Sequence, residues 1–176
     1  MSTGGDIVLG IDPGTAVTGY GVVRLGARGA PELIECGVIR TRAEQPLSHR
    51  LRDIHEGVVE LIARHSPATL AVEDVFYARN VRTTVVLGHA RGVILLAGEL
   101  AGVKIVEFAP AAIKKSIVGR GAATKEQVQF MVGQLLRLKT PPQPADAADG
   151  VAAALCALLS PQLPTIASLT LKVRRS

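Results

Sequence analysis

The chain has 176 residues, of which 48% are hydrophobic and 20% charged, and its formal net charge is +5. This length favours one domain with a full core, and a basic chain is compatible with a polyanionic partner. No apolar run reaches the roughly 18 residues that span a membrane, and the start lacks a signal-peptide pattern. We therefore expect a cytoplasmic protein with no membrane segment, in which Cys36 and Cys156 are reduced core thiols.

The first part of the sequence predicts three strands, over 6–12, 17–25 and 32–41. Short connections containing glycine join them, which favours an antiparallel meander. Over 46–65 the apolar residues change to a helical period, so a helix is expected there.

The second part alternates strands and helices. A short apolar strand is expected over 69–73 and a long helix rich in Val, Leu, Ala and Gly over 80–101. The remaining expected elements are a strand over 104–108, a short helix from Pro110, a helix opened by the capping-box sequence Thr124-Lys125-Glu126-Gln127, and a last helix over about 144–159. This order predicts an α/β domain with a mixed sheet over 1–160, followed by a basic, flexible tail over 161–176.

Four carboxylates stand on these apolar elements. Asp12 ends the first strand and Glu73 ends the fourth, while Asp146 and Asp149 lie three residues apart in the last helix. That spacing places the two helical acids on one face. A charge on an apolar element is costly unless it is paired or metal-bound, and converging carboxylates repel each other. The pattern therefore indicates a site for a hard divalent cation.

Five ordered blocks of the sequence carry a resemblance to a known family. The blocks are Gly10-Ile11-Asp12-Pro13-Gly14 with Thr18-Gly19-Tyr20-Gly21-Val22; Val72-Glu73-Asp74-Val75-Phe76; Gly88-His89-Ala90-Arg91-Gly92; Val118-Gly119 with Lys125, Gln127 and Val128; and Asp146-Ala147-Ala148-Asp149. From about residue 7 to about residue 160 the chain resembles the RuvC family of Holliday-junction resolvases, within the ribonuclease H-like superfamily.

The resemblance implies a ribonuclease H-like mixed five-stranded sheet flanked by helices. It makes Asp12, Glu73, Asp146 and Asp149 the metal-binding catalytic carboxylates, with two Mg²⁺ or Mn²⁺ ions per active site. Asp12 is the best candidate to bridge both ions, because the family places it at the centre of the sheet. The implied activity is a structure-selective endonuclease that resolves Holliday junctions in recombination and DNA repair, by paired, symmetric, metal-dependent nicks in two strands of a four-way junction.

Basic and aromatic residues form a second group. The family uses lysines at the positions of Lys114 and Lys125 near the scissile phosphate, and an aromatic at the position of Phe76 that stacks on unpaired bases. Without the resemblance, Phe76 would be an ordinary core residue and the basic loop a solvated surface. The residues expected to contact DNA are Phe76, Arg79, Arg82, Lys114, Lys115, Arg120 and Lys125.

The helix over 80–101 has apolar residues on more than one face, so it must be covered on two sides. In the family the corresponding helix forms a two-fold dimer interface, which predicts a homodimer here. The alternative is a monomer in which this helix is deeply buried. Family members also work with a branch-migration motor, so a motor complex is a further possible partner.

Functions other than junction resolution would use some of the same residues. Each acid alone has an ordinary role: Asp12 as a turn residue before Pro13-Gly14, Glu73 as a surface acid, and Asp146 as a first-turn helix acid. A ribonuclease H-like nuclease acting on structured RNA or RNA–DNA hybrid would use the same sheet and acids. An actin-like or sugar-kinase ATPase shares the Asp-Pro-Gly-Thr loop but needs two such domains. A non-catalytic junction-binding protein would gain nothing from four acids near DNA.

Overall fold

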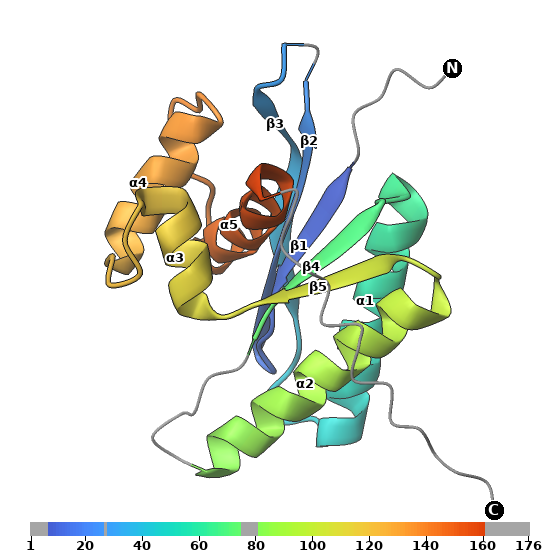
Figure 1. Ribbon diagram of the computed structural model, residues 1–176. Coiled ribbons are helices and arrows are strands. Elements are labelled where there is room, and N and C mark those ends of the chain that lie inside the picture. The colour runs from blue at the N-terminus through green and yellow to red at the C-terminus, as the bar shows by residue number, and fades with distance from the viewer. Residues whose placement is uncertain (1–6, 27, 75–80, 161–176) are drawn as a thin grey trace, which may run out of the picture.

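The computed structural model describes residues 7–26, 28–74 and 81–160, and its centre is a mixed sheet of five strands in the order β3-β2-β1-β4-β5 (Figure 1). The strands β1, β2 and β3 form the expected antiparallel meander, while β4 and β5 run parallel to β1. The strand bounds are Val8–Asp12, Val17–Leu25, Pro31–Arg40, Thr69–Glu73 and Lys104–Phe108 for β1 to β5. The predicted mixed five-stranded sheet is confirmed.

Five helices cover the two faces of the sheet in the described part of the chain. Helices α1 and α2 lie on one face, and α3, α4 and α5 lie on the other (Figure 1). Their bounds are Leu47–His65, Val81–Leu100, Pro110–Val118, Lys125–Leu135 and Ala145–Leu159 for α1 to α5. The Thr124 capping box is confirmed, with the Gln127 amide N–H donating to the Thr124 hydroxyl and the Gln127 side chain accepting from the Thr124 N–H. The predicted tail over 161–176 lies outside the described residues.

The strands alternate between two cores. On β1, Leu9 and Ile11 belong to the core under α1 and α2, whereas Val8 belongs to the core under α3, α4 and α5. Because side chains alternate along a strand, Asp12 points to the same face as Val8. The last residue of β1 thus delivers a carboxylate to the side of the sheet that α5 covers.

Helix α5 lies unusually close to the sheet, because glycine and alanine face each other there. A Cβ atom built on Gly10 would lie 2.3 Å from the backbone nitrogen of Ala154, and one built on Gly19 would lie 1.8 Å from the carbonyl oxygen of Asp146. Gly19 is also the register partner of Asp12. Because Gly19 has no side chain, the first turn of α5 packs directly against the end of the sheet where Asp12 lies.

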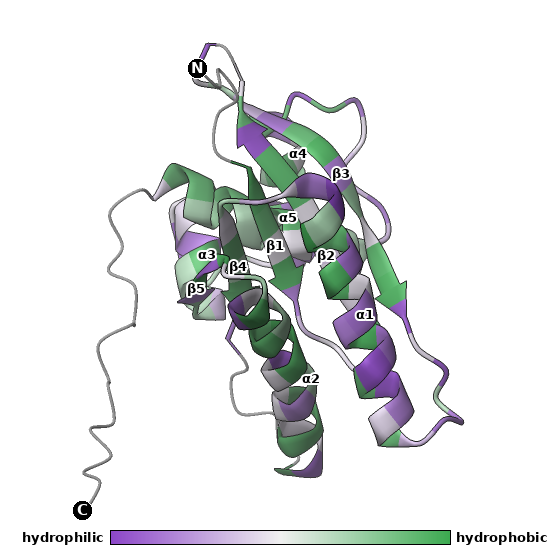
Figure 2. Ribbon diagram, turned by 90° about the vertical axis from the view of Figure 1, so that its right-hand side faces the viewer, coloured by the Kyte–Doolittle hydropathy of each residue, from purple (hydrophilic) through white to green (hydrophobic). Residues whose placement is uncertain are grey.

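Among the residues that the structure describes, helix α2 is covered on one side only. By length and composition it could cross a membrane, a test that core helices also pass, and its Ala90, Ile94 and Ala97 are buried against the sheet. The opposite side is open: Val81 is 79% exposed and Leu100 is 73% exposed. Figure 2 looks onto this face of the molecule, where α2 is largely hydrophobic and α1 largely hydrophilic. Within the described residues α2 is therefore not deeply buried, in contrast to what the monomer alternative assumed.

Candidate active site

Three elements bring the predicted carboxylates to one end of the sheet. Asp12 and Glu73 end β1 and β4, which are adjacent and parallel, as their registered neighbours Ile11 and Val72 show. Because adjacent parallel strands finish at the same edge, both acids emerge there. The first turns of α5 add Asp146 and Asp149, and one oxygen from each of Asp12, Asp146 and Asp149 lies within 4.8 Å of the other two.

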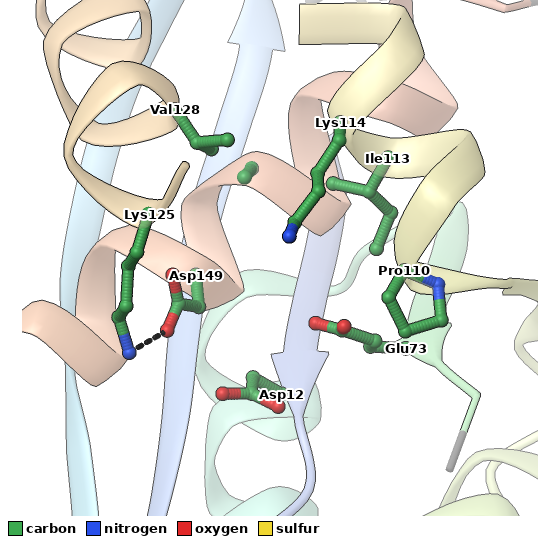
Figure 3. Close-up of a pocket in the computed structure, with 9 residues that line it drawn as sticks. Asp12, Glu73, Pro110, Ile113, Lys114, Lys125, Val128 and Asp149 are labelled. Carbon is green, nitrogen blue, oxygen red and sulfur yellow. Dashed lines mark ion pairs between the residues drawn. The ribbon is translucent and has the colours of Figure 1, made fainter. Parts of the chain in front are cut away.

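A cavity of about 230 Å³ opens beside these acids (Figure 3). Asp12, Glu73 and Asp149 line it, whereas Asp146 belongs to the acid cluster but not to the cavity wall. The acids therefore form two overlapping groups, which share Asp12 and Asp149. The other lining residues are Pro110, Ile113, Lys114, Lys125, Val128 and Ala152, from α3, α4 and α5.

The acids in this cavity are poorly neutralised. Burial, together with the nearby charges of Glu73 and Asp149, raises the pKa of Asp12 to about 8. Burial and the charge of Asp149 likewise raise the pKa of Glu73 to about 7. A raised carboxyl pKa means that the folded protein disfavours the ionised form. Protein groups alone therefore do not balance the negative charge that this fold gathers.

Lys125 supplies part of the missing positive charge. Its Nζ lies 2.6 Å from Oδ2 of Asp149, and this ion pair is the dashed line in Figure 3. Burial still raises the pKa of Asp149, although the hydrogen bond from Lys125 opposes it. The side chain of Lys114 points into the same cavity from α3, and its charge acts against the rise at Glu73. Two lysines thus face the acids that β1, β4 and α5 contribute to the cavity.

This donor set fits a hard divalent cation. Carboxylate oxygens are the ligands that Mg²⁺ and Mn²⁺ prefer in proteins, and those of Asp12, Asp146 and Asp149 are already close together. A cation would also remove the repulsion that raises the pKa values of Asp12 and Glu73. Three of the four predicted acids, Asp12, Asp146 and Asp149, form this cluster, and the fourth, Glu73, lines the adjoining cavity.

The structure separates the predicted DNA contacts into distinct positions. Lys114 and Lys125 line the acid cavity, whereas Lys115 and Arg120 are exposed at the end of α3 and in the turn that follows it. Arg82 is exposed in the first turn of α2. Phe76 and Arg79 lie outside the described residues.

Three features of this region were not predicted. The apolar wall of Ile113, Val128 and Ala152 faces the acids, and its signal in the sequence was only that of an ordinary helix core. The direct pairing of Lys125 with Asp149 was missed because their separation along the chain, 24 residues, carries no geometric information. An arginine on α2, Arg91, forms ion pairs with Asp74 and Glu107 on the opposite face, and no spacing in its sequence block indicates them.

Comparison with known proteins agrees with this geometry. The family model described as crossover junction endodeoxyribonuclease RuvC matches residues 8–157. A protein of that name from Desulforamulus reducens is 44% identical over 151 residues, which are 85% of this chain and 91% of that protein.

Solved structures are similar over nearly the same range. The RuvC structure from Thermus thermophilus superposes with a TM-score of 0.82 at 35% identity, covering 88% of this chain and 95% of that one. The structure of Thermus thermophilus RuvC in complex with a Holliday junction substrate gives a TM-score of 0.80 at 32% identity, covering 88% and 94%. The range matched by the family model includes nearly every residue from β1 to α5.

Proposed function

This chain belongs to the RuvC family of crossover junction endodeoxyribonucleases, and we propose that it resolves Holliday junctions through the acid cavity at the end of β1, β4 and α5. The reaction is hydrolysis of a phosphodiester bond in each of two symmetry-related strands of a four-way DNA junction. The observation that carries the proposal is the convergence of Asp12, Glu73 and Asp149 with two lysines in one cavity. Recombination and DNA repair are the processes that need this reaction, and we place it in the cytoplasm.

The carboxylates provide the cation site. Asp12, Asp146 and Asp149 would hold one Mg²⁺ or Mn²⁺ ion, and Glu73 with Asp12 and Asp149 would hold a second, so that Asp12 and Asp149 belong to both sets. When bound, such ions activate a water molecule and stabilise the charge of the leaving 3′-oxygen. The family match supports metal dependence, and the two overlapping acid groups support a count of two.

The protein's own cations complete the site. Lys114 reaches into the cavity beside Glu73, where an ammonium group would hold a phosphate oxygen and offset charge that develops on it. Lys125 holds Asp149 in place through their ion pair, and it lines the same cavity, where it would face a phosphate bound there. Lys115, Arg120 and Arg82 lie on exposed positions where contacts to the DNA backbone add affinity but no chemistry.

The outer side of α2 supports a homodimer. Val85 is 53% exposed and Leu96 is 50% exposed, and they lie on one stripe with Gly88 and Gly92, where an added Cβ would meet nothing within 4 Å. Exposed apolar residues around small ones allow a second helix to approach closely. Two copies joined here would carry two active sites, one for each strand cut. Sedimentation of the wild type and of Leu96→Asp tests this, because the variant should be monomeric. A branch-migration motor complex remains a predicted partner.

A substrate panel tests the proposed function. We would compare a mobile four-way junction, a linear duplex of the same sequence and an RNA–DNA hybrid, each with Mg²⁺, Mn²⁺ or EDTA. The proposal predicts metal-dependent nicks at symmetric positions in the junction alone. Cleavage of the hybrid in preference to the junction would favour the ribonuclease alternative. Junction binding without cleavage, across a series of core sequences with both metals, would contradict the proposal.

A further inference from the structure

An arginine on the far face of the sheet is tied to the end of the strand that carries Glu73. Arg91 lies on α2, and one of its terminal nitrogens donates to the carboxylate of Glu107 on β5. Its buried Nε lies 3.4 Å from Oδ1 of Asp74, the residue that follows Glu73, which is an ion-pair contact without a hydrogen bond. One guanidinium group therefore joins α2 to two neighbouring strands at once.

Those contacts meet where the pairing of β4 and β5 ends. Glu73 is the register partner of Phe108, and the N–H of Asp74 donates to the Phe108 carbonyl at 2.8 Å. Side chains alternate along a strand, so Glu73 points to the acid cavity while Asp74 and Glu107 point to α2. Arg91 thus contacts the end of β4 from the α2 face of the sheet. The side chain of Glu73 projects from the same strand end on the opposite face.

Glu73 needs such support because neighbouring carboxylates in the cavity repel its charge. It sits in a cavity with other carboxylates, and Asp149 is a repelling neighbour. It is also the last residue of β4, so only one side of its backbone is fixed by the ladder. A charged bridge on the opposite face fixes the strand end without adding a cation to the cavity itself.

We propose that Arg91 is a positioning residue for Glu73, holding the end of β4 through Asp74 and Glu107 so that the carboxylate stays directed at the metal site. The proposal rests on the proposed function. It also links α2 to the chemistry, since Arg91 is the neighbour of Gly92 in the exposed stripe of that helix.

The test compares Arg91→Met with the wild type. Partners that orient metal ligands typically contribute about 10–100-fold in metal affinity or activity. We expect single-turnover junction cleavage to slow by about 10–100-fold, while the Kd for the junction measured without divalent metal changes less than about twofold. In the absence of DNA, the Mn²⁺ concentration that half-saturates the protein, measured by calorimetry, should rise by about tenfold. Arg91→Lys should recover part of the loss, because a point charge can hold one acid but not bridge two.

Arg64→Met is the matched control. Arg64 also bridges two acids, Glu35 on β3 and Glu60 on α1, but none belongs to the acid cavity. This variant should retain the metal affinity and cleavage rate of the wild type. Equal losses in both variants would overturn the proposal, since they would reflect general destabilisation. Arg91→Met with unchanged metal affinity and rate would overturn it as well.

A double-mutant cycle keeps the inference testable if Arg91→Met folds poorly. If Arg91 acts through Asp74, Asp74→Asn alone should weaken Mn²⁺ binding, and adding Arg91→Lys should cost less than it does in the wild type. Full additivity would contradict the inference. A wild type that fails to cut any junction refutes the proposed function instead, whereas an active wild type beside an unaffected Asp74→Asn refutes only the role of Arg91.

Discussion

Two groups of carboxylates lie on opposite faces of one sheet, and the fold treats them in opposite ways. On the α1 face, Glu35 accepts a hydrogen bond from the Tyr20 hydroxyl at 2.8 Å, forms an ion pair with Arg64 at 3.0 Å, and pairs with His65 at 2.7 Å. On the α5 face, Asp12 and Glu73 line the cavity, where the ion pair at 2.6 Å joins Lys125 to Asp149 instead.

The pKa values reflect this difference. Partial burial acts against ionisation of Glu35, but the hydrogen bonds from Tyr20, His65 and Arg64 prevail and lower its pKa. At Asp12 burial and neighbouring acids act in the same direction, and the pKa rises to about 8. An ionised acid that has hydrogen-bond donors and cations around it stabilises the fold. Acids that are brought together without enough cations repel each other and lower the free energy of unfolding. The second arrangement is typical of a binding or catalytic site.

The largest expected effect is the loss of cleavage in Asp12→Asn. Asn keeps the shape but removes a charge from both overlapping acid groups, so single-turnover cleavage of a junction should fall by about 10³-fold or more. Junction affinity should persist, because phosphate contacts provide most of it. The metal-free melting temperature should rise, since one source of repulsion is gone. A variant that loses cleavage and also melts at a lower temperature would contradict the comparison.

The two groups should also respond to pH with opposite sign when metal is absent. The pKa of Asp12 is raised from 3.8 to about 8, so the folded state binds the proton more tightly, and this group's contribution to stability falls as pH rises from about 4 to about 8. The pKa of Glu35 is lowered from 4.5, so its contribution is present above that pH and is lost as pH falls through the folded value.

Melting temperatures at pH 5 and pH 8.5 in EDTA check the sign expected for Asp12, whereas the sign for Glu35 is checked by a further measurement at about pH 3. The advantage of Asp12→Asn over the wild type should grow with pH. Saturating Mg²⁺ should reverse that advantage, because the wild type gains the cation and the variant binds it poorly. An advantage that does not change with pH would mean that Asp12 is not the strained group.

A pair of glycine substitutions distinguishes the effect of displacing α5 on cleavage from the effect of lowering stability alone. In Gly19→Ala the new methyl group would overlap the Asp146 carbonyl, so we expect a loss of about 1–3 kcal/mol in the free energy of unfolding. Displacing the first turn of α5 should also slow cleavage by about 10²-fold. In Gly37→Ala the methyl group would lie 2.7 Å from the Tyr20 hydroxyl, which disturbs the Glu35 group instead. That variant should lose stability but keep its cleavage rate, as urea unfolding and junction assays can show.

The smallest expected effect belongs to Glu35→Gln. The neutral amide keeps one acceptor for Tyr20 but weakens the pairs with Arg64 and His65. Because these groups are partly exposed, we expect a loss of about 0.5–1.5 kcal/mol at pH 7 and no change in cleavage. Chemical unfolding of both proteins measures the difference. A cleavage defect in this variant would mean that the two faces of the sheet are coupled.

The sequence predicted the elements well, because each is short and bounded by clear signals. The capping residues at Thr124 and the apolar runs that end in Asp12 and Glu73 fix their elements to within two residues. The four acids could be grouped from the sequence for two reasons. Residues at the ends of adjacent parallel strands meet at one edge of a sheet, and residues three apart on a helix project from the same face. The family resemblance then supplied roles that spacing alone leaves open.

What the sequence left out depends on contacts between distant elements. The pairing of Lys125 with Asp149 and the bridge of Arg91 to Glu107 join residues whose spacing along the chain contains no periodic signal. The close approach of α5 needs Gly19 and the backbone of Asp146 to meet, which is a matter of packing depth. Glu35 was not predicted to be a paired acid, because an acid on a strand that alternates with apolar residues resembles a solvent-facing one.

The acids of the cavity come from the first strand, the fourth strand and the last helix of the described fold. A ribosome releases the chain from its N-terminus, so Asp12 and Glu73 emerge long before Asp149. No partial product of translation that stops before α5 can assemble the cluster of Asp12, Asp146 and Asp149. A chain that stops before α5 lacks Asp146 and Asp149, so it retains only Asp12 of the three clustered acids.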